Sequence, residues 1–192
     1  MLINEVASLE ESSGSSLEGS FTRDLVFSKY WLMHELSQIQ PHISTMYVLG
    51  SWYGNLALFL NRYSMVKVDH IINVETDPER LATGARMLDQ TGADNVEHML
   101  TDANRLDYRQ LDSTGAVVNT SLTEMPNTAW FEHIPPGTLV VLQARDHNPD
   151  QQFSKSEDIE RKFPLSQVLY SGSLDLEDPE TAYTRFMTIG RK

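Results

Sequence analysis

Short apolar runs alternate with longer amphipathic segments along most of the chain. The helical repeat of apolar residues occurs over Thr22–Gln40, Asn55–Tyr63 and Arg80–Gln90; the last segment is introduced by Thr76-Asp77-Pro78-Glu79 and stopped near Gly92. The apolar runs have the length and composition of buried strands, and they are Met46–Gly50, His70–Glu75, Val96–Leu100, Gly115–Thr120 and Gly137–Gln143. Strands that alternate with helices predict a mostly parallel sheet with helices on both faces.

The last third of the chain has a different pattern. A long polar stretch from Ala144 to Lys162 is followed by two alternating segments, 167–176 and 182–190, which a turn at 177–180 separates. Alternation on both sides of a short turn predicts an antiparallel hairpin. The predicted fold is therefore α/β: a three-layer, doubly wound, Rossmann-like domain over residues 21–192, with a mostly parallel seven-stranded sheet that ends in an antiparallel hairpin.

Residues 1–20 stand apart from this domain. The segment Ser8–Ser20 is rich in Ser, Gly and Glu, so it cannot contribute much to a core. Two interpretations stay open: a flexible leader, or a lid that orders over a bound ligand.

Composition narrows the classes of function. With 192 residues, 40% of them hydrophobic, the chain can bury one core, and it has no apolar run long enough to cross a membrane and no secretory signal pattern. The absence of cysteine excludes disulfides and thiolate chemistry and predicts a cytoplasmic protein. The formal charge of −12 argues against nucleic-acid and membrane partners, and the six histidines show no metal-ligand spacing. The oligomeric state stays open.

Polar residues follow the first four predicted strands. The turn Gly50–Asn55 comes after the first strand, Glu75 ends the second, Thr101–Asn104 follows the third, and Asn119–Leu122 ends the fourth. Parallel strands carry their ligands beyond their carboxyl ends. Glycine allows close approach of a ligand to the backbone, and an acid after the second strand can bind a ribose diol.

In these positions the chain resembles the class I S-adenosylmethionine-dependent methyltransferases, from about Tyr47 to the C-terminus. The resemblance implies S-adenosylmethionine as cofactor. It places the methionine part at the first turn, the ribose at the second strand end, the adenine after the third and the methyl group at the fourth, with a further contact from the N-terminal aromatic stretch. The residues implied are Gly50, Ser51, Trp52, Tyr53, Gly54, Glu75, Thr76, Asp102, Ala103, Asn104, Asn119, Thr120, Ser121 and Tyr30.

The chain departs from the family pattern in its first motif. Val48 stands where the family usually has an acid, and Trp52 stands where it usually has a middle glycine. Each strand-end residue also has a structural interpretation: Glu75 and Asp102 as caps, and Asn119 as a turn residue. A nicotinamide dehydrogenase is disfavoured because Gly50–Asn55 lacks the GxGxxG arrangement.

Methyl transfer needs alignment of the acceptor with the methyl group, and a base only where the acceptor arrives protonated. Asn119 and Glu124 are the predicted catalytic residues, with Asp146 and His147 as further candidates for the base. We expect an acceptor pocket between residues 27–31, the Asn119 loop and residues 144–162, sized for a small molecule. Two alternatives stay open: an enzyme that cyclises or cleaves S-adenosylmethionine, and a non-catalytic relative that binds it.

Overall fold

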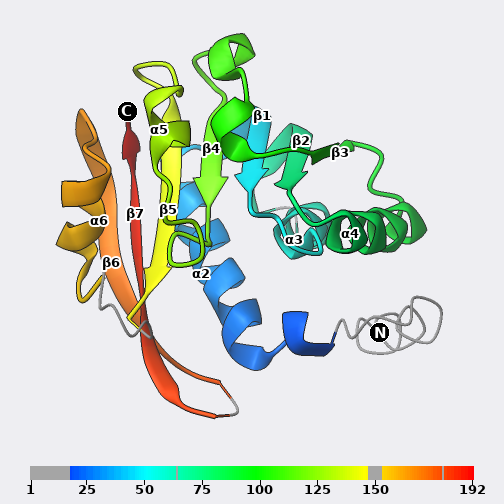
Figure 1. Ribbon diagram of the computed structural model, residues 1–192, viewed down its shortest axis with the longest axis horizontal. Coiled ribbons are helices and arrows are strands. Elements are labelled where there is room, and N and C mark those ends of the chain that lie inside the picture. Colours follow the sequence, from blue (N-terminus) through cyan, green and yellow to red (C-terminus); the bar gives the residue numbers. More distant parts are fainter. Residues whose placement is uncertain (1–17, 64, 147–152, 179) are drawn as a thin grey trace.

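The computed structural model describes residues 18–63, 65–146, 153–178 and 180–192 as a three-layer α/β domain (Figure 1). Its single sheet has the strand order β3-β2-β1-β4-β5-β7-β6. The strands β1 to β5 run parallel, and β7 runs antiparallel to both β5 and β6. The predicted fold and terminal hairpin are confirmed. The strands are β1 (His42–Leu49), β2 (Lys67–Glu75), β3 (Val96–Leu100), β4 (Ala116–Asn119), β5 (Leu139–Arg145), β6 (Gln167–Glu177) and β7 (Ala182–Arg191).

Helices cover both faces of the sheet, because the central strands are apolar on both sides. Along β1, Met46 and Val48 belong to one apolar cluster, while Tyr47 and Leu49 belong to the other. Residues of α2 (Arg23–Ile39), α3 (Asn55–Tyr63) and α4 (Pro78–Thr91) complete the first cluster. The second is completed by η2 (Ala103–Arg105), η3 (Tyr108–Gln110), α5 (Ala129–Glu132) and α6 (Ser156–Lys162). A further turn, η1 (Glu18–Ser20), precedes α2.

The helix α4 begins and ends where its residues predict. The Asp77 carboxylate accepts hydrogen bonds from the N–H groups of Glu79 and Arg80, and Pro78 occupies the first helical turn. Gly92 ends the helix with φ of 71°, the left-handed cap that glycine adopts without strain. This helix packs through Gly84 against Tyr53, in the turn that follows β1.

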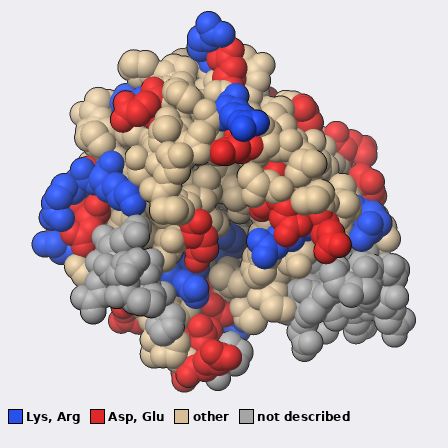
Figure 2. All heavy atoms as spheres, viewed as in Figure 1, with Lys and Arg blue, Asp and Glu red and all other residues tan. Residues whose placement is uncertain are grey.

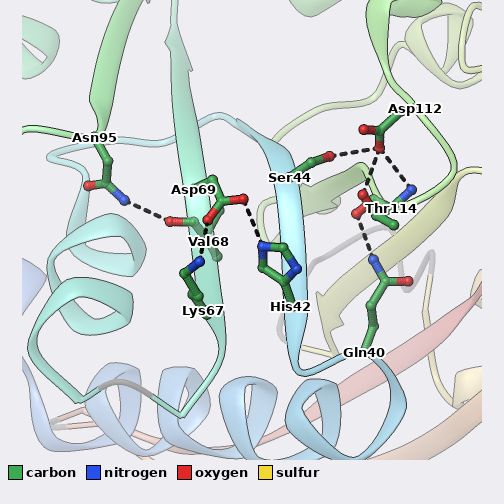
Figure 3. Close-up of polar contacts among 9 residues, drawn as sticks. All are labelled: Gln40, His42, Ser44, Lys67, Val68, Asp69, Asn95, Asp112 and Thr114. Carbon is green, nitrogen blue, oxygen red and sulfur yellow. Dashed lines mark hydrogen bonds and ion pairs between the residues drawn. The ribbon is translucent and has the colours of Figure 1, made fainter.

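Two strands are longer than the apolar pattern predicts: β1 begins at His42 rather than Met46, and β2 begins at Lys67 rather than His70. Their first residues are polar (Figure 3): Asp69 on β2 contacts His42 across the strands at 2.7 Å and Lys67 on its own strand at 2.9 Å. Exposed cross-strand pairs extend a sheet without any apolar signal. These contacts lie at the amino ends of the strands, away from the ligand edge.

The short helices α5 and α6, of 4 and 7 residues, were not predicted from the sequence. They are too short for a helical repeat to be recognised. The second forms the last part of the predicted polar stretch 144–162, and the first residues of that stretch extend β5 to Arg145. Within the described ranges, no helix combines the length and the apolar character that a membrane span requires.

Candidate functional site

A cavity of about 770 Å³ lies at the carboxyl ends of the parallel strands. Figure 2 shows the corresponding face of the molecule hollowed near its centre, with acidic and basic side chains around the hollow. Most of the residues that the sequence nominated border this one cavity: Gly50, Ser51, Trp52, Glu75, Thr76, Asp102, Ala103, Asn104, Thr120, Ser121 and Glu124.

The turn after β1 has an unusual backbone. Gly50 and Gly54 have φ angles of 59° and 75°, and Trp52 between them has φ of 55°. A left-handed conformation costs a non-glycine residue about 1–2 kcal/mol. Trp52, the residue that replaces the family's middle glycine, therefore keeps a glycine-like backbone at the cost of local strain.

Glu75 is both a cavity residue and a structural acceptor. Its side chain is 7% exposed, and its Oε2 accepts a hydrogen bond of 2.9 Å from the N–H of Trp52. Its Oε1 accepts from the N–H groups of Thr76 at 2.8 Å and Asp77 at 3.1 Å. Glu75 therefore caps backbone N–H groups and also borders the cavity.

Asp102 combines the same two properties after β3. Its Oδ1 accepts hydrogen bonds from the N–H of Asn104 at 2.9 Å and from the Asn104 side chain at 2.7 Å. The Asn104 Oδ1 in turn accepts from the N–H of Trp130 at 2.8 Å. This chain of contacts fixes the loop that forms one end of the cavity.

Four nominated residues, Tyr30, Tyr53, Gly54 and Asn119, do not border the cavity. Asn119 is fully buried; its Oδ1 accepts from the N–H of Ser121 at 2.9 Å, and its amide lies 3.3 Å from the sulfur of Met125. The geometry thus supports its interpretation as a turn residue, and its catalytic role stays a prediction without a contact to support it.

The other three lie close to Tyr63, Gly84 and Asn73, which do not border the cavity. The ring of Tyr30 lies 4.8 Å from that of Tyr63. The carbonyl oxygen of Tyr53 lies 2.7 Å from where a Cβ on Gly84 would stand, so α4 approaches the turn through a glycine. A Cβ on Gly54 would stand 2.8 Å from the Asn73 amide.

Seven charged residues at the cavity, among those that the structure describes, were not named individually from the sequence: Asp24, Lys29, Arg80, Arg145, Asp178, Glu180 and Arg185. Two of them, Lys29 on α2 and Arg145 at the end of β5, belong to the segments 27–31 and 144–162 that were expected to form the acceptor pocket. Lys29 donates a hydrogen bond of 2.9 Å to Thr120 Oγ1. Burial, reinforced by the charge of Arg185 and opposed by Glu124, lowers the pKa of Lys29 to about 7. Arg185 could have been identified from the sequence, because it is a charged residue inside the otherwise mostly uncharged strand segment AYTRFMTIG.

The base candidates lie in different places. The Glu124 side chain is 56% exposed, and its carboxylate lies 3.7 Å from the Arg145 guanidinium. Asp146 does not border the cavity and accepts from the N–H of Thr184 at 3.0 Å. His147 lies outside the described residues, as do residues 1–17 of the proposed lid. Of the leader, Gly19 and Ser20 border the cavity.

No protein-family model matches the sequence, and no curated protein matches it significantly. Solved structures do match. An rRNA methylase from Streptococcus thermophilus is 16% identical, with 89% of this chain and 98% of that chain covered and a TM-score of 0.58. The precorrin-6y C5,15-methyltransferase of Geobacter metallireducens GS-15 is 14% identical, with 85% and 87% covered and a TM-score of 0.56. This chain has the methyltransferase fold.

The TYW2 protein of M. jannaschii, solved in complex with AdoMet, has the same architecture. It is 9% identical, with 90% of this chain and 78% of that chain covered and a TM-score of 0.58. At these identities the likeness establishes the fold. The methyltransferase-type fold inferred from the strand-end residues is thereby confirmed.

Proposed function

We propose that this protein binds S-adenosylmethionine in the cavity at the strand ends and transfers its methyl group to a small-molecule acceptor. The observation that carries the proposal is the convergence of Trp52, Glu75 and Asp102, from three successive strand ends, on one cavity of about 770 Å³. Ligands of open α/β sheets bind at this edge. The methyltransferase fold of the chain agrees with this use.

The cavity residues fit such a cofactor. Glu75 Oε2 accepts a single N–H, so a lone pair remains for a ribose hydroxyl. Asp24, which is 5% exposed, has its Oδ1 buried without a hydrogen-bond partner among the described residues. An orphaned buried carboxylate oxygen at the cavity suits a cationic group, because a charge unpaired in the interior is costly. Asp24 thus provides an acid near the cavity although Val48 replaces the family's usual one.

The residues of this chain would act mainly by positioning. S-adenosylmethionine supplies an activated methyl group on a sulfonium centre. The turn at Gly50–Trp52 and the buried Glu75 would hold the cofactor, and the Thr120–Ser121 loop, which borders the same cavity, would face the acceptor. Glu124 is the proposed proton acceptor, since it borders the cavity beside Arg145.

A small acceptor is favoured over nucleic acid by charge. The printed names of the neighbours include an rRNA methylase, so an RNA acceptor is the alternative to test. The formal charge of this chain is −12, which repels a polyanion, and on the face shown in Figure 2 acidic and basic groups are interspersed. We therefore propose no nucleic-acid partner; the cytoplasmic location stays a prediction.

Calorimetry and thermal unfolding test the shared premise. S-adenosylmethionine or S-adenosylhomocysteine should bind and raise the melting temperature, because each binds only the native state. An unchanged melting temperature with millimolar ligand would contradict the cofactor assignment. Product analysis then separates the chemistries: S-adenosylhomocysteine marks methyl transfer, methylthioadenosine marks cleavage or cyclisation, and binding without turnover marks a non-catalytic relative. Labelled methyl recovered in RNA would overturn the small-molecule assignment.

A further inference from the structure

Two arginines face each other at the acceptor side of the cavity. Arg145 on β5 and Arg185 on β7 are direct partners in the antiparallel register. Their guanidinium carbons lie 6.0 and 5.8 Å from the centre of the same ring, that of Tyr183. Like charges directly opposite each other destabilise a sheet. The two arginines therefore do not stabilise the sheet by facing each other, which points to a role in binding.

Arg185 is buried without a matching charge. Its side chain is 6% exposed and borders the cavity, and no carboxylate of the described residues lies within ion-pair distance of it. Its hydrogen bond from Nη1 to the Thr120 carbonyl is long, 3.4 Å, and it also interacts with the Tyr183 hydroxyl, while its Nε has no hydrogen-bond partner in the described structure. Buried arginines are normally paired with an anion.

Of the neighbouring carboxylates, Asp24 keeps its Oδ1 without a hydrogen-bond partner but does not form an ion pair with either arginine in the described structure. The Asp24 Oδ2 accepts a hydrogen bond of 2.6 Å from the Tyr183 hydroxyl, and Glu124 lies 3.7 Å from Arg145. At the hairpin turn, the Asp178 carboxylate accepts the N–H groups of Glu180 and Thr181, and the exposed Glu180 borders the cavity.

A third cation meets this group at Thr120. Lys29 donates to the Thr120 hydroxyl, and Arg185 donates to the Thr120 carbonyl. Burial is the main cause of the lowered pKa of Lys29, about 7, and the charge of Arg185 lowers it further, so Lys29 is a cation below about pH 7. We name Lys29, Arg145 and Arg185 the cationic cluster. An anion placed among them would pair the buried guanidinium.

The cationic cluster meets the cofactor residues at Thr120 and extends from there toward β5 and β7. In the strand order, β7 is the third strand from β1 and the fourth from β2. At about 4.8 Å between neighbouring strands, the Arg185 backbone lies roughly 14 Å from the β1 turn and roughly 19 Å from the end of β2. Its guanidinium reaches back to the Thr120 carbonyl, and the next residue, Ser121, contacts Gly50 of the β1 turn. A cofactor bound across the ends of β1 to β3 leaves this end of the cavity to the acceptor.

We infer that the methyl acceptor is a small acid, and that the cationic cluster binds its carboxylate or phosphate group, with Arg185 as the principal contact. This inference rests on the proposed function. An arginine fork binds such groups through two parallel hydrogen bonds, which fixes orientation as well as position. Because the cluster meets the loop after β4, an acid held there presents its nucleophile toward the Thr120–Ser121 side of the cavity.

Calorimetric titration of the protein saturated with S-adenosylhomocysteine tests the inference, with inorganic phosphate in one arm and succinate in the other. The wild type should bind one or both probes, and the stronger arm identifies the acidic group. The Arg185→Met substitution should weaken that binding by about tenfold or more, and Arg185→Lys by less, because lysine keeps the charge without the fork. Arg161→Met is the control: Arg161 is exposed on α6, pairs with Asp158 and should leave binding unchanged.

Several outcomes would overturn the inference: no binding of either probe to the wild type, or unchanged binding by Arg185→Met. Where Arg185→Met does not fold, Arg145→Met replaces it, at a side chain that is 35% exposed, and should weaken binding at least threefold. Unchanged binding in Arg145→Met would then overturn the inference.

The affinity for the cofactor shows whether the cationic cluster binds the acidic group of the acceptor or the carboxylate of the cofactor. Arg185→Met should leave S-adenosylhomocysteine and 5′-methylthioadenosine binding unchanged. Loss of affinity for the first alone would assign the cluster to the cofactor carboxylate and overturn the inference. If neither cofactor form binds, the proposed function fails by itself, and the phosphate and succinate titrations on the free protein still decide whether Arg185 binds an anion.

Discussion

The N–H of Trp52 donates a hydrogen bond of 2.9 Å to the carboxylate of Glu75, which joins the turn after β1 to the end of β2. The left-handed φ of 55° at Trp52 belongs to this turn. Two parts of the proposed cofactor site, 23 residues apart in the chain, are thus directly linked by a hydrogen bond. A change at either residue should affect both binding and folding.

Substitution of Glu75 separates these two effects. Glu75→Ala removes the acceptor of three backbone N–H groups and should lower the free energy of unfolding by about 1–3 kcal/mol. Glu75→Gln keeps an acceptor oxygen and should fold better, yet lower the affinity for S-adenosylhomocysteine by about 1.5–3 kcal/mol. Denaturant unfolding and calorimetry measure the two quantities. The exposed Glu97→Gln is the control; unchanged affinity in Glu75→Gln would make Glu75 a cap alone.

Trp52 should report ligand binding by its fluorescence. Of the tryptophans Trp31, Trp52 and Trp130, only Trp52 borders the cavity among the described residues. Binding of S-adenosylhomocysteine should therefore change the emission of the wild type, and Trp52→Phe should abolish that change while Trp31→Phe keeps it. A response that survives in Trp52→Phe would place the ligand elsewhere.

Gly84 should be required for the position of the turn. A Cβ on Gly84 would stand 2.7 Å from the Tyr53 carbonyl oxygen, so Gly84→Ala must displace backbone. Although alanine favours helix, the clash should cost about 1–3 kcal/mol net and weaken cofactor binding. Ala82→Gly, at an exposed position of the same helix, should cost about 1 kcal/mol and leave binding intact. Equal affinities in both variants would contradict this account.

The stability of the protein should depend on pH through Lys29. Its pKa is about 7 in the folded protein and 10.5 in its ordinary state, so between pH 7 and 10 the unfolded chain carries a proton at Lys29 that the folded chain lacks. The free energy of unfolding therefore gains a contribution that rises with pH in this window and is flat below it. Lys29→Met removes this contribution.

The measurement is urea unfolding at pH 6 to 10. Subtracting the Lys29→Met profile from that of the wild type cancels the other titrating groups. The difference should rise from about pH 7, whereas the matched difference for the exposed Lys67→Met should not. Parallel wild-type and Lys29→Met profiles would show that the Lys29 pKa is not lowered.

Much of the fold and part of the site follow from local pattern. The central strands were identifiable because burial on both faces makes them continuous apolar runs. The strand-end residues Gly50, Glu75 and Asp102 could be assigned to one edge because parallel strands end together. The polar starts of β1 and β2 and the short helix α6 were missed, since neither has an apolar repeat.

The cationic cluster depended on the tertiary structure. Lys29, Arg145 and Arg185 come from a helix and two strands far apart in the sequence, and the antiparallel insertion of β7 beside β5 brings the arginines together. Their burial and the pairing of nearby carboxylates depend on distances in space that cannot be read from the spacing of residues along the sequence. By itself the sequence determined the alternation of strands and helices and the edge where a ligand binds, because these follow from local hydrophobic periodicity. Which charged side chains are buried at the acceptor end was decided by the tertiary structure, because the packing of distant segments determines which groups are removed from water.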